Sequence, residues 1–163
     1  MEKFQVLGDE AKKKIKVADH MLTITYPLVQ DPKLLLAILE NVFLAQTDAM
    51  SSVLEYERLF KRVPPFHDTF DSKFNLFRSK IAPKSNINPY YIKMMQEVKE
   101  IVVGHKQSPV EFARKDKFVI CSSEYNLKTL NMADVKKYVE QTKQFVREME
   151  VLVTKNGQIF RRD

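Results

Sequence analysis

Residues 31–65 read DPKLLLAILENVFLAQTDAMSSVLEYERLFKRVPP, and this stretch decides the fold class. Asp31 followed by Pro32 is a helix start signal, because an Asp side chain accepts first-turn N–H groups and proline suits the first helical position. Pro64 and Pro65 are the stop signal. Apolar residues recur between them at helical spacing: Leu35, Ile38, Val42, Ala45, Ala49, Val53, Tyr56 and Phe60. The pattern predicts a helix to Val63, about 48 Å long at 1.5 Å per residue.

Two parts of this stretch predict how the helix packs. Residues 34–39, LLLAIL, are apolar all round, which indicates burial on several sides. Residues 45–52, AQTDAMSS, are small and polar. Such a segment either lets a partner helix approach closely or lines a wet groove, and we favour close packing. The sequence leaves open whether the helix is continuous there.

Other helices are predicted on both sides of this stretch. The first runs from Asp9 to about Ile24, and Tyr26-Pro27 ends or bends it. The next begins at Asp68 or Thr69, and another begins at Asn88-Pro89 and ends at Gly104 as a C-cap glycine. Their apolar stripes are Ala11, Ile15, Ala18 and Leu22; Phe70, Phe74, Phe77 and Ile81; and Tyr91, Met95, Val98 and Val102.

The C-terminal third combines a hairpin with a last helix. Ser108-Pro109-Val110-Glu111 resembles a capping box and predicts a short helical turn. Residues 118–121 and 127–130 flank SSEYN as two strands of a hairpin would. Asn131 caps the last helix, which we expect to end at Lys155-Asn156-Gly157. Its stripe is Val135, Tyr138, Thr142, Phe145, Met149 and Leu152.

These signals predict an all-α protein, an up-down bundle of about five helices with a long second helix and a small β-hairpin before the last helix. We expect a single domain over residues 1–163, with the core in 9–153 and a tail in 154–163.

Composition narrows the function classes. The one cysteine, Cys121, excludes an internal disulfide and a Cys-based zinc site. We find no signal peptide and no run of about 18 uncharged apolar residues, so we expect a cytoplasmic protein without a membrane span. No phosphate-binding GxxxxGK[ST] loop occurs, and we expect no cofactor. The net charge of +6 is compatible with RNA, DNA or acidic lipid. Because the lysines are spread along the chain, we favour simple solvation of helix faces.

Histidines and carboxylates offer few catalytic groupings. His20 and His67 lack a second ligand at metal-binding spacing, and we predict no metal site. The pairs Glu55/Glu57 and Glu97/Glu100 are interpreted as solvated side chains on charged helix faces.

His105 is the best chemical candidate in the chain. Lys99, Lys106, Arg114, Lys115 and Lys117 are near it in sequence. A histidine can move the proton of an RNA 2′-hydroxyl while a cation stabilises the charged phosphorane, so this grouping is the minimum for cleavage without metal. The alternative, which we favour, is that His105 follows or caps the end of a helix. A third interpretation is anion binding at the helix N-terminus predicted at Ser108-Pro109.

The layout resembles the HEPN superfamily of small helical bundles, whose signature is Arg, four to six residues, then His. Counting back from His105 gives Glu100, Lys99 and Val98 with four, five and six residues between, so Lys99 stands where Arg is typical. The resemblance implies a homodimer with a composite RNase site made by His105 and Lys99, with Arg114 as a second source of charge. It also implies RNA contacts by Lys106, Lys115 and Lys117, and an antitoxin or nucleotidyltransferase-type partner.

Two functions remain open at this point. The first is a non-catalytic or degenerate HEPN-like protein acting as a dimeric interaction or regulatory module. The second is a metal-independent endoribonuclease or RNA-binding protein of HEPN type that uses His105 with Lys99 and Arg114. The missing arginine favours the first.

Overall fold

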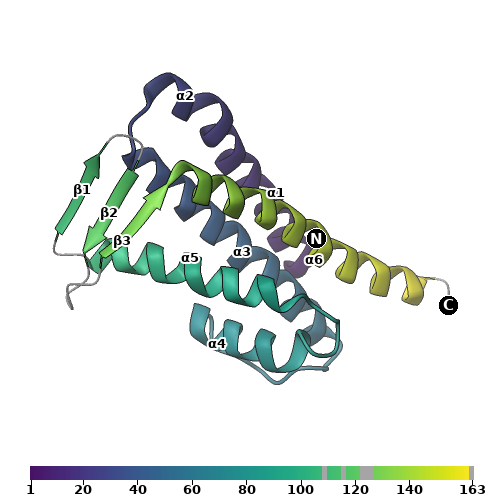
Figure 1. Cartoon of the computed structure of the whole chain (residues 1–163). Coiled ribbons are helices and arrows are strands. Elements are labelled where there is room, and N and C mark those ends of the chain that lie inside the picture. The colour runs from purple at the N-terminus through teal and green to yellow at the C-terminus, as the bar shows by residue number, and fades with distance from the viewer. Residues whose placement is uncertain (108–109, 115–116, 122–126, 162–163) are drawn as a thin grey trace.

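A computed structural model describes the backbone of residues 1–107, 110–114, 117–121 and 127–161, and the side chains of residues 1–105 and 130–154. Five helical segments form the bundle in Figure 1, if each π-helical turn is counted with the helix it continues. They are α1 (Lys3–His20) with η1 (Met21–Thr25) and α2 (Tyr26–Val29); α3 (Lys33–Leu59); α4 (Phe70–Leu76) with η2 (Phe77–Ile81); α5 (Pro89–Gln107); and α6 (Met132–Arg161). The predicted all-α bundle with a long second helix is therefore confirmed.

Helix α3 is the centre of the bundle, and α1, α4, α5 and α6 all contact it. It is continuous over 27 residues, about 40 Å, and ends at Leu59 rather than Val63. The Asp31 carboxylate accepts the backbone N–H of Lys33 at 3.0 Å, as predicted for the helix start. Of the described helices, α3 alone has the length and apolarity to cross a membrane, and most of that stretch is buried inside the bundle.

The small residues in the middle of α3 allow α1 to approach closely, as predicted. Ala45, Ala49 and Ser52 are buried. The Ser52 hydroxyl donates to the carbonyl of Phe4 at 2.6 Å, and a Cβ added to Gly8 would lie 3.5 Å from the Ser52 oxygen. Side chains this small leave room for neighbouring backbones to pack against one another.

A buried polar contact joins α3 to α6 at mid-height. Gln46 and Thr142 are both fully buried, and the Gln46 amide donates to the Thr142 hydroxyl at 2.8 Å. The Thr142 hydroxyl lies 3.9 Å from the sulfur of Met94 on α5. Because a buried polar group without a partner is costly, this pair fixes the relative height of the two helices.

The first helical segment continues through Tyr26-Pro27 instead of ending there. Proline lacks an N–H and crowds the carbonyl four residues earlier. The π-helical turn of η1 precedes Pro27, and the N–H of Tyr26 donates to the carbonyl of Met21. In this wider turn the backbone hydrogen bonds join residues five apart instead of four, just before Pro27. The helix continues to Val29, and Gln30, with a φ of 54°, follows its end.

Three predicted helix starts are confirmed by side-chain caps. The Thr69 hydroxyl accepts the N–H of Ser72 at 3.2 Å. The side-chain carbonyls of Asn88 and Asn131 accept the N–H groups of Tyr90 and Asp134 at 3.0 and 2.9 Å.

Two further predicted helix ends are wrong. Helix α5 passes through Gly104 and continues to Gln107, and α6 passes through 155–157 and continues to Arg161, where a tail was expected. Glycine costs a helix only about 1 kcal/mol, and it marks an end only where the chain turns left-handed. No described glycine has a positive φ.

The predicted hairpin is part of a larger sheet. Strands β2 (Lys117–Cys121) and β3 (Leu127–Asn131) pair antiparallel, which confirms the hairpin. Strand β1 (Val110–Arg114) pairs with β2 in the register Val110 to Cys121, so the predicted helical turn over 108–111 is wrong in its described part. The local capping pattern is overridden because pairing with β2 satisfies the backbone groups of this segment.

Two leucines of α3 test how far this helix is buried. Leu39 is fully buried and Leu44 is 44% exposed. We expect Leu39→Ala to lower the free energy of unfolding by about 2–5 kcal/mol, because it leaves a cavity. Leu44→Ala should cost less than about 1 kcal/mol. Urea denaturation followed by circular dichroism measures both; equal losses would contradict the central position of α3.

Candidate functional site

The two best-placed predicted site residues, Lys99 and His105, lie on one helix but on different faces. They are six positions apart on α5, which is about 9 Å along the axis and about 120° around it. The sequence analysis expected the helix to end at Gly104, so that His105 would lie after the helix. Because α5 continues to Gln107, the helix keeps the two side chains apart.

Lys99 is turned toward α4. Its ammonium group lies 2.6 Å from the carboxylate of Asp71 and 5.4 Å from the centre of the Phe70 ring. An ion pair and a cation–π contact both hold this side chain against the neighbouring helix. Lys99 therefore already has a structural role, which is to join α5 to α4.

His105 continues the core-facing stripe of α5. Val98 and Val102 precede it by seven and three residues and are buried, and His105 itself is half-buried. It lies within the last turns of the helix, so the expectation that it follows the helix end is wrong. Its position favours packing at the end of the core over contact with a long polymer.

The other predicted site residues lie outside the described side chains. Arg114 is on β1, Lys117 is on β2 and Lys106 is in the last turn of α5. Lys115, and Ser108-Pro109 of the anion-binding interpretation, lie outside the described backbone. Among the described residues no group of three His, Cys, Asp or Glu side chains could hold a metal ion.

Glu57 is not solvated as predicted. Its side chain is 8% exposed, and one carboxylate oxygen lies 2.6 Å from Nε of Arg62 and 3.6 Å from the ammonium of Lys84. The hydrogen bond to Glu57 raises the pKa of Arg62. This carboxylate joins the end of α3 to the loop after η2. No pattern in the sequence indicated this contact, because Lys84 is distant in the chain.

Glu97 also has a partner from another helix. Its carboxylate accepts the hydroxyl of Tyr138 at 3.1 Å, and the Tyr90 hydroxyl donates to Gln141. Burial, followed by the charge and hydrogen bond of Glu97, raises the pKa of Tyr138. The phenol therefore stays protonated and donates to Glu97 in ordinary buffers. These contacts join α5 to α6, and nothing in them suggests acid–base catalysis.

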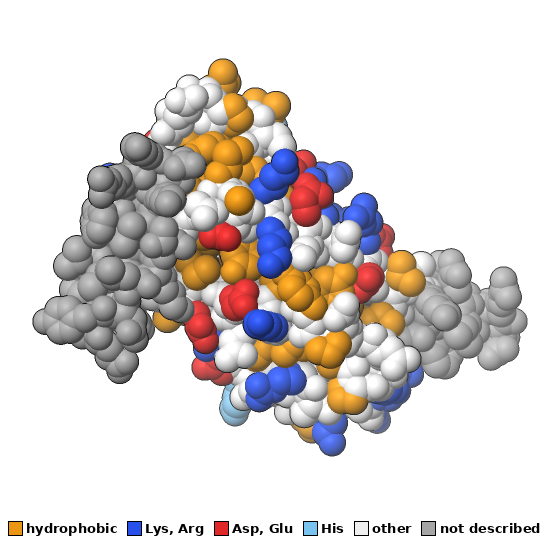
Figure 2. Space-filling view, in the orientation of Figure 1, with side chains coloured by type: hydrophobic (Ala, Val, Ile, Leu, Met, Phe, Trp, Pro, Cys, Tyr) orange, Lys and Arg blue, Asp and Glu red, His pale blue; other side chains and the backbone are white. Residues whose placement is uncertain are grey.

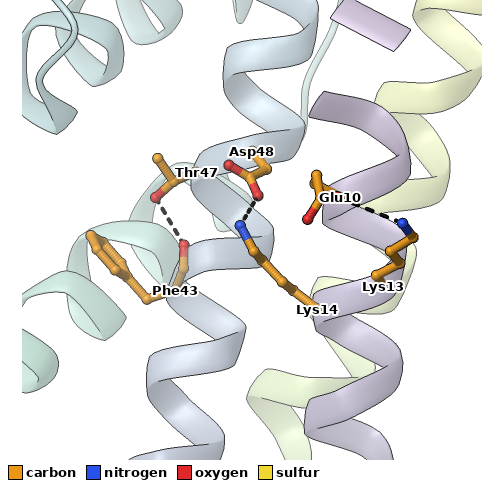
Figure 3. Close-up of polar contacts among 6 residues, drawn as sticks. All are labelled: Glu10, Lys13, Lys14, Phe43, Thr47 and Asp48. Atoms are coloured by element: carbon orange, nitrogen blue, oxygen red, sulfur yellow. Dashed lines mark hydrogen bonds and ion pairs between the residues drawn. The ribbon is translucent and has the colours of Figure 1, made fainter. Parts of the chain in front are cut away.

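Figure 3 shows the seam between α1 and α3. Lys14 pairs with Asp48 across the seam, and Lys13 pairs with Glu10 along α1 at 3.7 Å. The Thr47 hydroxyl donates to the carbonyl of Phe43 at 2.8 Å. Only the Lys14–Asp48 pair joins α1 to α3, and the other two contacts each lie within one helix. All three use polar groups for structure rather than for chemistry.

The largest concentration of positive charge follows the end of α3. Residues 58–84 contain seven Lys or Arg and two Asp or Glu, a net charge of +5 out of +6 for the whole chain. Six of the cations are exposed, and together we call them the basic edge: Arg58, Lys61, Arg62, Arg78, Lys80 and Lys84. Figure 2 shows Lys and Arg side chains over the part of the molecule where α4 lies in Figure 1. This concentration of charge was not apparent in the sequence analysis, which considered the lysines over the whole chain.

Aromatic rings alternate with these cations. The Arg62 guanidinium lies 4.9 Å from the centre of the Phe60 ring, and that of Arg58 lies 5.4 Å from Phe66. Phe60 is 39% exposed and Phe66 is half-buried. Cations placed over rings that solvent reaches are a common feature of surfaces that bind single-stranded nucleic acid.

Comparison of the chain with protein-family profiles, with curated proteins and with solved structures found no match.

Because Lys99 and His105 lie on different faces of α5, we predict that the protein does not cleave RNA. We expect the protein to show no cleavage of structured or single-stranded RNA in EDTA, and His105→Ala to behave in the same way. The reason is that Lys99, held by Asp71, does not stand beside the imidazole to stabilise a phosphorane. Cleavage in EDTA that His105→Ala abolishes, with the circular dichroism spectrum unchanged, would restore the RNase interpretation.

Proposed function

We propose that this protein is a non-catalytic, HEPN-like helical module that binds single-stranded RNA on its basic edge. The observation that carries the proposal is the net charge of +5 on residues 58–84, interleaved with aromatic rings. This surface differs from the His105 region to which the sequence pattern pointed.

Arg58 and Lys61 are two exposed cations of the basic edge that stand at the end of α3 and can meet phosphate. Neither makes an ion pair with a described residue, whereas Arg62 and Lys84 share Glu57. The Phe66 ring supports the guanidinium of Arg58 from one side, which leaves its N–H edge for a bidentate phosphate contact. Lys61 has a φ of 57° and stands at the turn that ends α3.

Phe60 supplies the contact that distinguishes a single-stranded nucleic acid from other polyanions. Its ring is partly exposed beside Arg62, so a base can stack on it while the neighbouring phosphates meet the cations. A surface with lysines alone would hold any polyanion by charge. The ring therefore favours a nucleic acid over an acidic membrane.

Removal of two cations from the basic edge tests this proposal. We expect Arg58→Ala/Lys61→Ala to weaken binding of single-stranded RNA about tenfold or more. The slope of log affinity against log salt should fall by about 1.4, because each phosphate that a cation neutralises contributes about 0.7. Fluorescence anisotropy at several salt concentrations measures both quantities.

The matched control is Lys13→Ala/Lys16→Ala, which removes the same charge from exposed positions on α1. It should change affinity less than about twofold if binding is local to the basic edge. Equal weakening by the two double variants would reduce the interaction to net charge. Equal binding of RNA and of acidic vesicles by the wild type would contradict the role of Phe60.

A second candidate, self-association, has its own observation. Val17, Ile24 and Leu28 are spaced by seven and four residues along the first helical segment, and they are 47%, 50% and 82% exposed. We propose that this stripe is the contact of a homodimer. An apolar stripe at this spacing is typical of helix–helix contacts.

Leu28→Asp tests the homodimer. The wild-type protein should sediment as a dimer at micromolar concentration, and Leu28→Asp should shift it to monomer because a carboxylate would be buried without a partner. Leu59→Asp, at another exposed apolar position, is the control. A monomeric wild type would exclude this stripe as a dimer contact.

A further inference from the structure

A cavity of about 350 Å³ lies between α1, α3 and α6. Three helical stripes meet there: Phe4, Gly8 and Ala11 from α1, Ala49, Ser52 and Tyr56 from α3, and Val146, Met149 and Val153 from α6. The small residues that bring α1 close to α3 leave this space on the side of α6. Its volume is within the range of small-molecule sites in proteins.

The lining is apolar inside and acidic at its opening. Polar residues reach the cavity along the line where α1 faces α6, and they include Gln5, Asp9, Lys12, Glu150 and Thr154. Lys12, the only Lys or Arg among the described lining residues, already lies 2.5 Å from Glu150. Asp9 is exposed and makes no ion pair with a described residue. Within the described part of the chain, the carboxylate of Asp9 therefore stays available to a cationic ligand.

Tyr56 supplies an independent observation. It lines the cavity and is 2% exposed, and its hydroxyl makes no hydrogen bond of normal geometry with a described residue. The hydroxyl does interact with the Arg62 guanidinium, which lies over the ring, and this interaction contributes to the raised pKa of Arg62. A buried hydroxyl in this condition costs stability unless water or a ligand atom satisfies it. The cavity therefore contains polar bonding capacity as well as apolar space.

We propose that this cavity binds a small aliphatic amine, with the hydrocarbon chain inside and the ammonium group between Asp9 and Glu150. A water molecule accounts for about 30 Å³ of liquid, and a methylene group is similar in size, so about eight to ten carbons fit. A ligand carboxylate at the opening would be repelled by Asp9 and Glu150, and it would have to compete with Glu150 for Lys12. An alcohol would have no charge for Asp9 to bind. This site is independent of RNA binding.

The experiment uses the full chain with methyl-labelled methionine and n-octylamine as the probe. Met149 lines the cavity, whereas Met94 and Met95 are buried in α5 and do not line it, so the protein contains its own reference signals. We expect a saturable shift of the Met149 methyl resonance with little change in those of Met94 and Met95. Octanoate and octanol should bind at least about tenfold more weakly. Asp9→Asn should weaken octylamine binding about two- to fivefold.

Two variants fill the cavity. Ala49→Leu should abolish the Met149 shift, with folding checked by circular dichroism. Gly8→Ala is the milder variant, because its added Cβ meets Ser52 at an ordinary 3.5 Å, and it should weaken binding while the fold is kept. The proposal is overturned if octylamine gives no saturable Met149 shift, if the three probes bind equally, or if the shift survives Ala49→Leu in folded protein.

Discussion

Burial of α3 on nearly all sides is the constraint on which the rest of the structure depends. An isolated helix of this composition would expose a large apolar surface to water. In the folded protein the four other helical segments pack against α3 and cover this surface. Within that arrangement Gln46 and Thr142 fix the height of α6, and Ser52 fixes the approach of α1. The small side chains of α3 have two effects: α1 can approach α3 closely, and a cavity remains beside α6.

The sequence predicted the helices well because their signals are local. Asp31, Thr69, Asn88 and Asn131 each act within three residues of a helix start, and the apolar stripes depend only on a period of 3.6. The predictions were wrong where contacts with residues elsewhere in the chain outweighed a local signal. Gly104 remained helical, and residues 110–114 joined a sheet whose pairing partner comes later in the chain.

The candidate site was harder to predict than the fold for the same reason. The spacing pattern paired Lys99 with His105, but it does not specify the faces of α5 on which the two side chains lie. Asp71 and Phe70, which hold Lys99, come from another helix, and Lys84 reaches Glu57 across the loop. By contrast, the charge of residues 58–84 can be read from the chain alone once it is counted by segment. The structure adds that six of these cations are exposed and that three of them lie over aromatic rings.

The pairing of the first helix with the last has a consequence for synthesis of the chain on the ribosome. Lys12 and Asp19 of α1 contact Glu150 and Lys143 of α6, so the two helices run antiparallel along one another. While translation proceeds, α1 can pack against α3, but the side of this helical pair that α6 covers stays in water until residues 132–154 have emerged. Until α6 has emerged, the nascent chain therefore presents an incomplete apolar surface, and only this helix, translated after the other four helical segments, covers it.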